Sequence, residues 1–159
     1  MSLVLTPEQI GQIEREGMAA YPNECCGAML GRDVADAGGV RRVVARLAPM
    51  SNSFAADQQY HRFSLDPRDL LRLEKDAAEA GLSVLGFYHS HPNHPARPSE
   101  TDRRHAWPYY SYVIVAIADR RPGDLTSWQL DESTGQFNPE QIVRDPISGN
   151  RQENRQALL

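Results

Sequence analysis

The chain is organised around one stretch of sequence, Val84-Leu85-Gly86-Phe87-Tyr88-His89-Ser90-His91-Pro92. Its first half is a short apolar run, which predicts a buried strand over residues 84–89. The strand leads into a polar loop over residues 90–98, where three prolines exclude regular structure. Because side chains two apart on an extended chain project from the same face, His89 and His91 can present two imidazoles to one ion while Ser90 points away.

A carboxylate follows the two histidines at a position that suits metal binding. Asp102 lies in the first turn of a helix expected to begin at Ser99, and it can fold back across the proline-rich loop. Two nitrogens and one oxygen leave one position of a tetrahedral zinc site open, which is typical of a catalytic zinc. An acid in a first helical turn also complements the helix dipole without any metal, so that interpretation stays open for Asp102.

Two further residues are candidates for the chemistry. Glu24 stands before an apolar strand expected over residues 25–31, where partial burial would raise its proton affinity. It can therefore take a proton from water and later return it to a leaving amine. A surface carboxylate at a strand edge is the alternative interpretation of Glu24. Ser99 has the position of a helix N-cap followed three residues later by an acid, a role that needs no catalysis.

The rest of the chain alternates helical and strand patterns. A capping box at Thr6 predicts a first helix that ends near Tyr21, and Asp66-Pro67 predicts a second helix that ends at Gly81. We also expect strands over residues 40–47, 60–65, 112–118 and 127–130, a functional loop over residues 49–59, and a short helix from Pro139. These elements predict the α/β fold class, in a single domain with a mixed central sheet flanked by helices.

Composition narrows the classes of function. The 159 residues suit one domain, and the net charge of −4 provides no basic field for nucleic acid. No stretch approaches the roughly 20 apolar residues of a membrane span, and the N-terminus has no signal-peptide pattern, so we expect a cytoplasmic protein without a membrane partner. Cys25 and Cys26 are neighbours, which rarely form an unstrained disulfide, so we expect reduced thiols in a packing role.

The spacing of these residues resembles the JAMM motif of MPN-domain metalloproteases. The motif reads His-x-His-Pro, six residues, Ser, two residues, Asp, preceded by Pro-x-Glu-x-Cys-Gly, and here it falls on Glu24, His89, His91, Pro92, Ser99 and Asp102. The resemblance covers residues 3–143 and leaves residues 144–159 as a polar, loosely ordered tail. It implies an MPN/cytidine-deaminase-like fold and one zinc ion per chain, held by His89, His91 and Asp102. It also implies that Glu24 is the acid/base and that Ser99 stabilises the oxyanion.

The resemblance also implies a substrate, a ubiquitin-like or sulfur-carrier protein that is cleaved after its C-terminal Gly-Gly. Small bacterial members of this type resemble enzymes that act on sulfur carriers. A noncatalytic MPN scaffold is one alternative, although such modules typically lack some motif residues and this chain has all of them. A zinc peptidase or amidase that acts on small substrates is another. His61, His94 and His105 have ordinary explanations, and we expect none of them to be a ligand.

Overall fold

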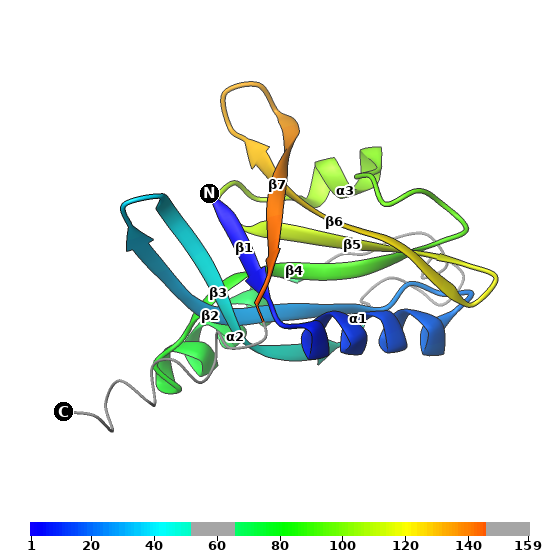
Figure 1. Ribbon diagram of the computed structural model, residues 1–159, viewed down its shortest axis with the longest axis horizontal. Coiled ribbons are helices and arrows are strands. Elements are labelled where there is room, and N and C mark those ends of the chain that lie inside the picture. The colour runs from blue at the N-terminus through cyan, green and yellow to red at the C-terminus, as the bar shows by residue number, and fades with distance from the viewer. Residues whose placement is uncertain (52–65, 146–159) are drawn as a thin grey trace.

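The computed structural model describes residues 1–51 and 66–145, and within these ranges seven strands close into one barrel in the order β1-β3-β2-β4-β5-β6-β7. The strand β4 lies between β2, to which it is antiparallel, and β5, to which it is parallel. Figure 1 shows how β1, beside the N-terminus, closes the barrel by pairing with both β3 and β7. The strands are β1 Ser2–Leu5, β2 Cys26–Asp36, β3 Gly39–Met50, β4 Ser83–Pro92, β5 Ser111–Ala118, β6 Arg121–Asp131 and β7 Gln136–Arg144. The expected mixed sheet is confirmed.

Three helices accompany the barrel in the described residues: α1 Pro7–Ala20, α2 Pro67–Glu79 and α3 Glu100–His105. The capping box at Thr6 is present, since its hydroxyl accepts from Gln9 N–H and the Gln9 side chain accepts from Thr6 N–H. The helix α1 lies close to the barrel at Gly17, where an added Cβ would lie 3.0 Å from Ile117 and 3.3 Å from Ser90. In α2 the N-cap is Asp66, and Gly81 follows the helix with a positive φ of 71°.

The core divides into two clusters that lie on opposite faces of β4. Tyr88 belongs to the cluster that also contains residues of α1, and Phe87 belongs to the cluster that contains Ala77 of α2. Because side chains alternate along a strand, His89 and His91 follow Phe87 on one face. Ser90 follows Tyr88 on the α1 face, which agrees with its closeness to Gly17. This alternation separates the two histidines from the helix-packed side of the strand.

Several element predictions are wrong in extent or kind. No helix begins at Pro139, because residues 136–144 pair with β6 and β1 as β7, so sheet pairing overrides the local helical pattern. The strand β3 does not end before Pro49 but continues to Met50, and β4 continues past His89 to Pro92 through pairing with β5. The four-residue β1 was not predicted. The expected tail is wrong at its start, because Arg144 ends β7 and Asp145 N–H donates to Leu5 O at 3.1 Å. The rest of the expected loop 49–59, the expected strand 60–65 and the tail from residue 146 lie outside the described residues.

In the part of the chain that the structure describes, no helix combines the length and the apolar character needed to cross a membrane.

The contact between β4 and β5 yields the first testable prediction. Gly86 pairs with Ser111, and a Cβ added at Gly86 would lie 1.8 Å from the Ser111 carbonyl oxygen. Because backbone must move to relieve this clash, Gly86→Ala should lower the free energy of unfolding by about 3 kcal/mol, the upper end for overpacking. Gly123→Ala on β6 is the matched control, since its nearest neighbour would lie at 3.6 Å. Urea unfolding should separate the two variants, and equal midpoints would contradict the close approach.

Candidate metal centre

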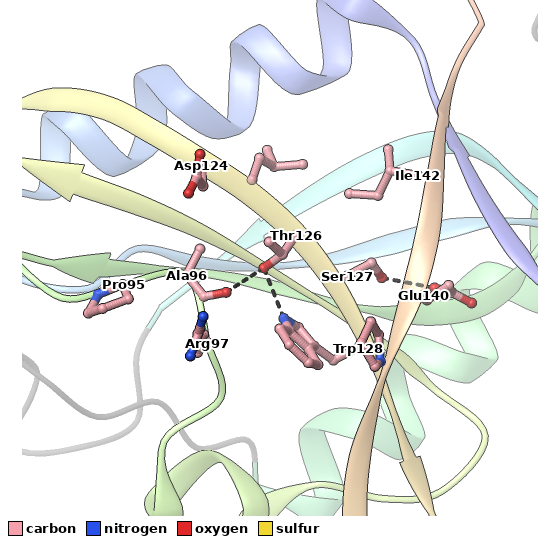
Figure 2. Close-up of a pocket in the computed structure, with 11 residues that line it drawn as sticks. Pro95, Ala96, Arg97, Asp124, Thr126, Ser127, Trp128, Glu140 and Ile142 are labelled. Carbon is pink, nitrogen blue, oxygen red and sulfur yellow. Dashed lines mark hydrogen bonds between the residues drawn. The ribbon is translucent and has the colours of Figure 1, made fainter.

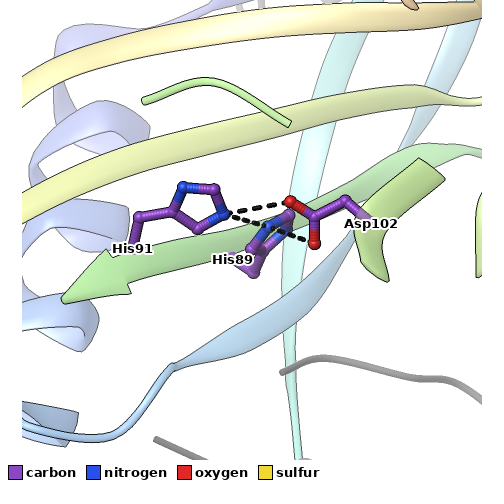
Figure 3. A group of neighbouring side chains, drawn as sticks. All are labelled: His89, His91 and Asp102. Atoms are coloured by element: carbon purple, nitrogen blue, oxygen red, sulfur yellow. Dashed lines mark hydrogen bonds and ion pairs between the residues drawn. The ribbon is translucent and has the colours of Figure 1, made fainter. Parts of the chain in front are cut away.

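His89, His91 and Asp102 bring their ligand atoms to one point (Figure 3), where all lie within 4.8 Å of one another. The Nε2 atoms of the two histidines are 3.1 Å apart. Asp102 Oδ1 lies 3.2 Å from His89 Nε2, and Asp102 Oδ2 lies 3.0 Å from His91 Nε2. The three side chains are 2%, 7% and 8% exposed, so the group is almost fully removed from water. Two imidazoles and a carboxylate in this arrangement can hold a divalent metal ion.

The capping box of α3 orients Asp102. Asp102 N–H donates to Ser99 Oγ at 3.0 Å, and Ser99 N–H donates back to Asp102 Oδ2 at 2.8 Å. Burial by itself would raise the pKa of the Asp102 carboxyl, but the charges and hydrogen bonds of His89 and His91 hold that pKa well below its usual range. Asp102 is therefore an ionised carboxylate. The N-cap role expected of Ser99 is confirmed.

A backbone carbonyl orients His91. Its Nδ1 lies 2.8 Å from Pro95 O, so with Nδ1 protonated the Nε2 lone pair faces the shared point. The next carbonyl in the loop, Ala96 O, accepts a hydrogen bond from Thr126 Oγ1 at 2.7 Å, and Trp128 Nε1 donates to the same hydroxyl at 2.9 Å. Strand β6 thus supports the loop whose Pro95 carbonyl contacts His91. Sequence reasoning missed these supporting residues, because only the barrel brings residues 126–128 beside residues 95–97.

A cavity of about 570 Å³ lies on this supporting side. Figure 2 shows Thr126 between Ala96 and Trp128 at the cavity wall, with Ser127 donating to Glu140 beside it. The lining contains none of His89, His91 and Asp102: it consists of Pro95, Ala96, Arg97, Asp124, Leu125, Thr126, Ser127, Trp128, Pro139, Glu140 and Ile142. This cavity is therefore separate from the candidate metal centre.

Glu24 is buried rather than at the surface, which rules out the alternative of an exposed strand-edge carboxylate. The residue is 6% exposed, and its Oε2 atom is buried with no hydrogen-bond partner among the described residues. Burial, together with the nearby negative charge of Asp102, raises the pKa of Glu24 to about 9. An uncompensated buried carboxyl of this kind is costly and marks a candidate functional group.

The remaining predicted residues have the expected ordinary surroundings. Cys25 and Cys26 are free thiols, and burial raises their pKa values to about 11 and about 12, so neither has the low pKa of a nucleophile. Only Cys26 lies within β2, and Cys25 precedes it. His94 and His105 are exposed and lie outside the ligand group, as expected. His61 lies outside the described residues.

The fold and the site define a single small barrel domain with a candidate metal centre of two histidines and one aspartate. Residues 7–131 match the family described as prokaryotic homologs of the JAB domain. The match extends over most of the chain and includes Glu24 and the three candidate ligands. The chain belongs to this family, which confirms the resemblance inferred from the motif.

Relatives support the same assignment. The desampylase of Haloferax volcanii is 38% identical over 120 residues, which are 74% of this chain and 79% of that protein. The CysO-cysteine peptidase of Mycobacterium tuberculosis is 26% identical over 142 residues, 89% of this chain and 91% of that protein. The crystal structure of a JAB1/MPN domain protein from Archaeoglobus fulgidus has a TM-score of 0.51 at 17% identity and covers 91% of this chain and 97% of its own, which shows a shared fold.

The raised pKa of Glu24 predicts a pH-dependent stability of the metal-free protein. The folded state holds the Glu24 proton up to a pH of about 9, whereas the unfolded chain releases it near 4.5, so folding stability should fall as pH rises between these values. Glutamine cannot ionise, so Glu24→Gln should be more stable than the native chain by at least about 1 kcal/mol at pH 8 and nearly equal at pH 4. Urea unfolding with a chelator present measures both differences. The exposed Glu8→Gln is the control, and an equal gain at both pH values would contradict the assignment.

Proposed function

We propose that this chain is a zinc-dependent peptidase that cleaves after the C-terminal Gly-Gly of a ubiquitin-like or sulfur-carrier protein. One observation carries the proposal: with the His89, His91 and Asp102 group there is a buried Glu24 whose pKa the Asp102 charge helps to raise, and whose Oε2 has no hydrogen-bond partner among the described residues. A purely structural metal site needs no such carboxyl. A hydrolytic site needs one, because a proton must leave the attacking water and reach the departing amine.

The donor set fits zinc. Zinc favours imidazole nitrogens and carboxylate oxygens in tetrahedral geometry, and three protein ligands leave one position for water or substrate. The two Nε2 atoms and the Asp102 oxygens approach one another to 3.0–3.2 Å, so two imidazoles and one carboxylate could all bind the same cation. Zinc held at such a site lowers the pKa of bound water and polarises a carbonyl group.

Glu24 moves the proton in this proposal. Its Oε2 accepts no hydrogen bond from the described residues, so this oxygen is available to a proton donor in the site. Burial alone would keep Glu24 protonated at neutral pH, but a cation held by the three ligands would lower its pKa again, so that the carboxylate could take a proton from water and hold it until the amine leaves. One carboxyl thus acts first as base and then as acid, whereas the ionised Asp102 remains an anion throughout.

Ser99 supports the site in two ways in this proposal. Its Oγ accepts from Asp102 N–H, which fixes the first turn of α3. The hydroxyl also has a proton of its own, which it can donate to the oxyanion that develops on a carbonyl under attack. The cap places this hydroxyl three residues from the ligand Asp102, so both functions use one conformation of the helix N-terminus.

The names of the relatives support the proposed substrate class. One of them is named a desampylase and another a CysO-cysteine peptidase. A protein of Thermus thermophilus that is 39% identical over 74 residues, 46% of this chain and 49% of that protein, is named a probable TtuB-protein conjugate cleaving protease. Cleavage next to two glycines suits a buried ligand group, because glycine lets a backbone approach closely without a Cβ clash. Specificity would then depend on the folded body of the carrier.

Two alternatives remain distinct from this proposal. A noncatalytic scaffold would not need the buried Glu24, the two histidines and the aspartate together, and all four are present. A zinc peptidase or amidase for small substrates would use the same four residues on a different substrate. Metal content tests the first alternative, and a comparison of substrates tests the second.

Zinc content is the next prediction. The purified chain should hold about one zinc ion, since two imidazoles, one carboxylate and a water complete a tetrahedral shell. His91→Ala should lower zinc content and activity while the barrel stays folded, because the core clusters do not include His91. Elemental analysis with circular dichroism measures both. His94→Ala, an exposed histidine three residues further along the chain, should change neither, and unfolding of His91→Ala would indicate a structural metal instead.

Substrate preference is tested with three compounds: a ubiquitin-like sulfur carrier with a C-terminal amino-acid adduct, the same adduct on a Gly→Ala tail, and a free peptide with the native tail sequence. We expect turnover of the first, and a loss of about 10- to 100-fold for the alanine tail, which adds one methyl group in a confined channel. The free peptide should be slower because it lacks the carrier body. Equal turnover of the three compounds would favour the small-substrate alternative.

The variant Glu24→Gln should retain zinc and lose about 10²- to 10⁴-fold in kcat, because the amide cannot accept a proton from water.

A further inference from the structure

The segment that carries Glu24 does not belong to any helix or strand. It lies between α1, which ends at Ala20, and β2, which begins at Cys26. Its middle is exposed at Pro22 and Asn23, yet Glu24 itself is buried. A buried carboxyl on an irregular segment needs contacts that hold it in place, because neither helical nor sheet hydrogen bonding fixes its backbone. Within the segment, Asn23 N–H donates to Ala20 O of α1 at 2.8 Å, and two further contacts come from β4 and the residue that follows it, the part of the chain that carries both histidines.

The first contact is a pair of hydrogen bonds between Cys25 and Ser90. Cys25 N–H donates to Ser90 Oγ at 2.8 Å, and Ser90 N–H donates to Cys25 O at 3.2 Å. Ser90 is fully buried, so its hydroxyl replaces water as the acceptor for that amide. The register between β2 and β4 agrees with this Cys25–Ser90 contact, since Cys26 is opposite His89. Continuing it places Cys25 opposite Ser90 and Glu24 opposite His91.

Because side chains alternate along β4, Ser90 and the two histidines lie on opposite faces of the strand. Residues opposite each other in an antiparallel pair project to the same face, so Glu24 lies on the face of the histidines. Ser90 lies on the other face, where its Cβ approaches Gly17 of α1. Ser90 therefore holds the Glu24 segment from the α1 face of β4 and is not part of the ligand group.

The second contact lies at the other end of the segment. Tyr21 and Asn93 exchange hydrogen bonds of 2.8 and 3.0 Å between the phenol oxygen and the side-chain amide. Asn93 follows the last residue of β4 and has a positive φ of 59°, and its own N–H donates to Ile117 O at 2.7 Å. Hydrogen bonds therefore hold the segment on both sides of Glu24: Cys25 to Ser90 on one side and Tyr21 to Asn93 on the other. We call each of these contacts a tie.

We propose that Ser90 is a positioning residue that fixes the Glu24 carboxyl beside the candidate metal centre, with the Tyr21 and Asn93 pair as a second, weaker tie. The inference rests on the proposed role of Glu24. Loss of the Ser90 hydroxyl leaves the Cys25 amide without its buried acceptor, and the segment must move to find another. Because a displacement of about 1 Å can cost 10²-fold in rate, such movement would lower turnover with the metal ligands intact.

The experiment compares Ser90→Ala with Tyr88→Phe. Tyr88 is the matched control, because it is 0% exposed, lies two residues before Ser90 on β4, and donates a 2.7 Å hydrogen bond to Glu16 of α1. We expect Ser90→Ala to lower kcat on the carrier adduct about 10- to 100-fold with zinc affinity unchanged. Loss of a residue that orients a metal ligand would instead lower zinc affinity, typically by about 10- to 100-fold. Tyr88→Phe should lower stability only. Tyr21→Phe removes the second tie from a partly exposed site and should give a smaller loss of kcat, which also provides a variant that folds if Ser90→Ala does not.

A double-mutant cycle with Glu24→Gln separates positioning from a general structural effect. If Ser90 acts through Glu24, the pair Ser90→Ala and Glu24→Gln should be no slower than Glu24→Gln alone. Equal fractional losses in both backgrounds, or loss of zinc from Ser90→Ala, would overturn the inference. So would native kcat in both Ser90→Ala and Tyr21→Phe.

Amide hydrogen exchange of the metal-free protein tests the tie without any substrate. The Cys25 amide should exchange faster in Ser90→Ala than in the native chain, while the amides of β5 keep their protection. Unchanged protection of Cys25 would overturn the tie itself. Native turnover of Glu24→Gln would instead overturn the proposed function and, with it, the effect of Ser90 on rate, so the two failures give different results.

Discussion

The strand β4 is the constraint on which the rest of the molecule depends, because it is paired on both sides. Its antiparallel register with β2 sets Cys26 opposite His89, and its parallel register with β5 sets His91 opposite Ala116. A shift of one residue in either pairing would exchange the two faces of the strand and send the histidines toward α1. The approach of β4 to β5 at Gly86 leaves no space for a side chain, so this register is fixed sterically as well as by hydrogen bonds.

The two carboxyls of the site show how surroundings separate residues of similar chemistry. Burial opposes ionisation of both Asp102 and Glu24. Asp102 overcomes this because two histidines and the Ser99 N–H surround its oxygens, whereas Glu24 Oε2 has no donor among the described residues. The pKa of Asp102 is therefore lowered and that of Glu24 raised. One carboxyl is suited to bind a cation and the other to carry a proton, and neither could replace the other without a change of neighbours.

The candidate site could be predicted from sequence to a greater extent than the barrel. His89 and His91 follow from alternation on a strand, and Asp102 from the cap at Ser99, because these relations are local. The position of Glu24 before an apolar strand makes it a candidate proton carrier, but only the motif links it to the ligands, since no local rule places residue 24 near residue 102. Barrel closure is nonlocal, so the short β1 and the pairing of β7 were missed. Buried Arg42, which donates to Leu85 O at 2.8 Å, has no signal in sequence that distinguishes it from the exposed arginines around it.

Closure of the barrel contributes to the site through the loop that orients His91. The Pro95 carbonyl beside His91 belongs to a loop whose next carbonyl is bonded to Thr126 on β6. Strand β6 is held between β5 and β7, and β7 is held in turn by β1. The four residues of β1 therefore support a histidine of β4 with which they do not pair, through β7, β6 and the loop. Because hydrogen bonds link each step, disorder in β1 would loosen β7 and β6 before it reached the loop, and the imidazole would lose its orientation without any change to the three ligands themselves.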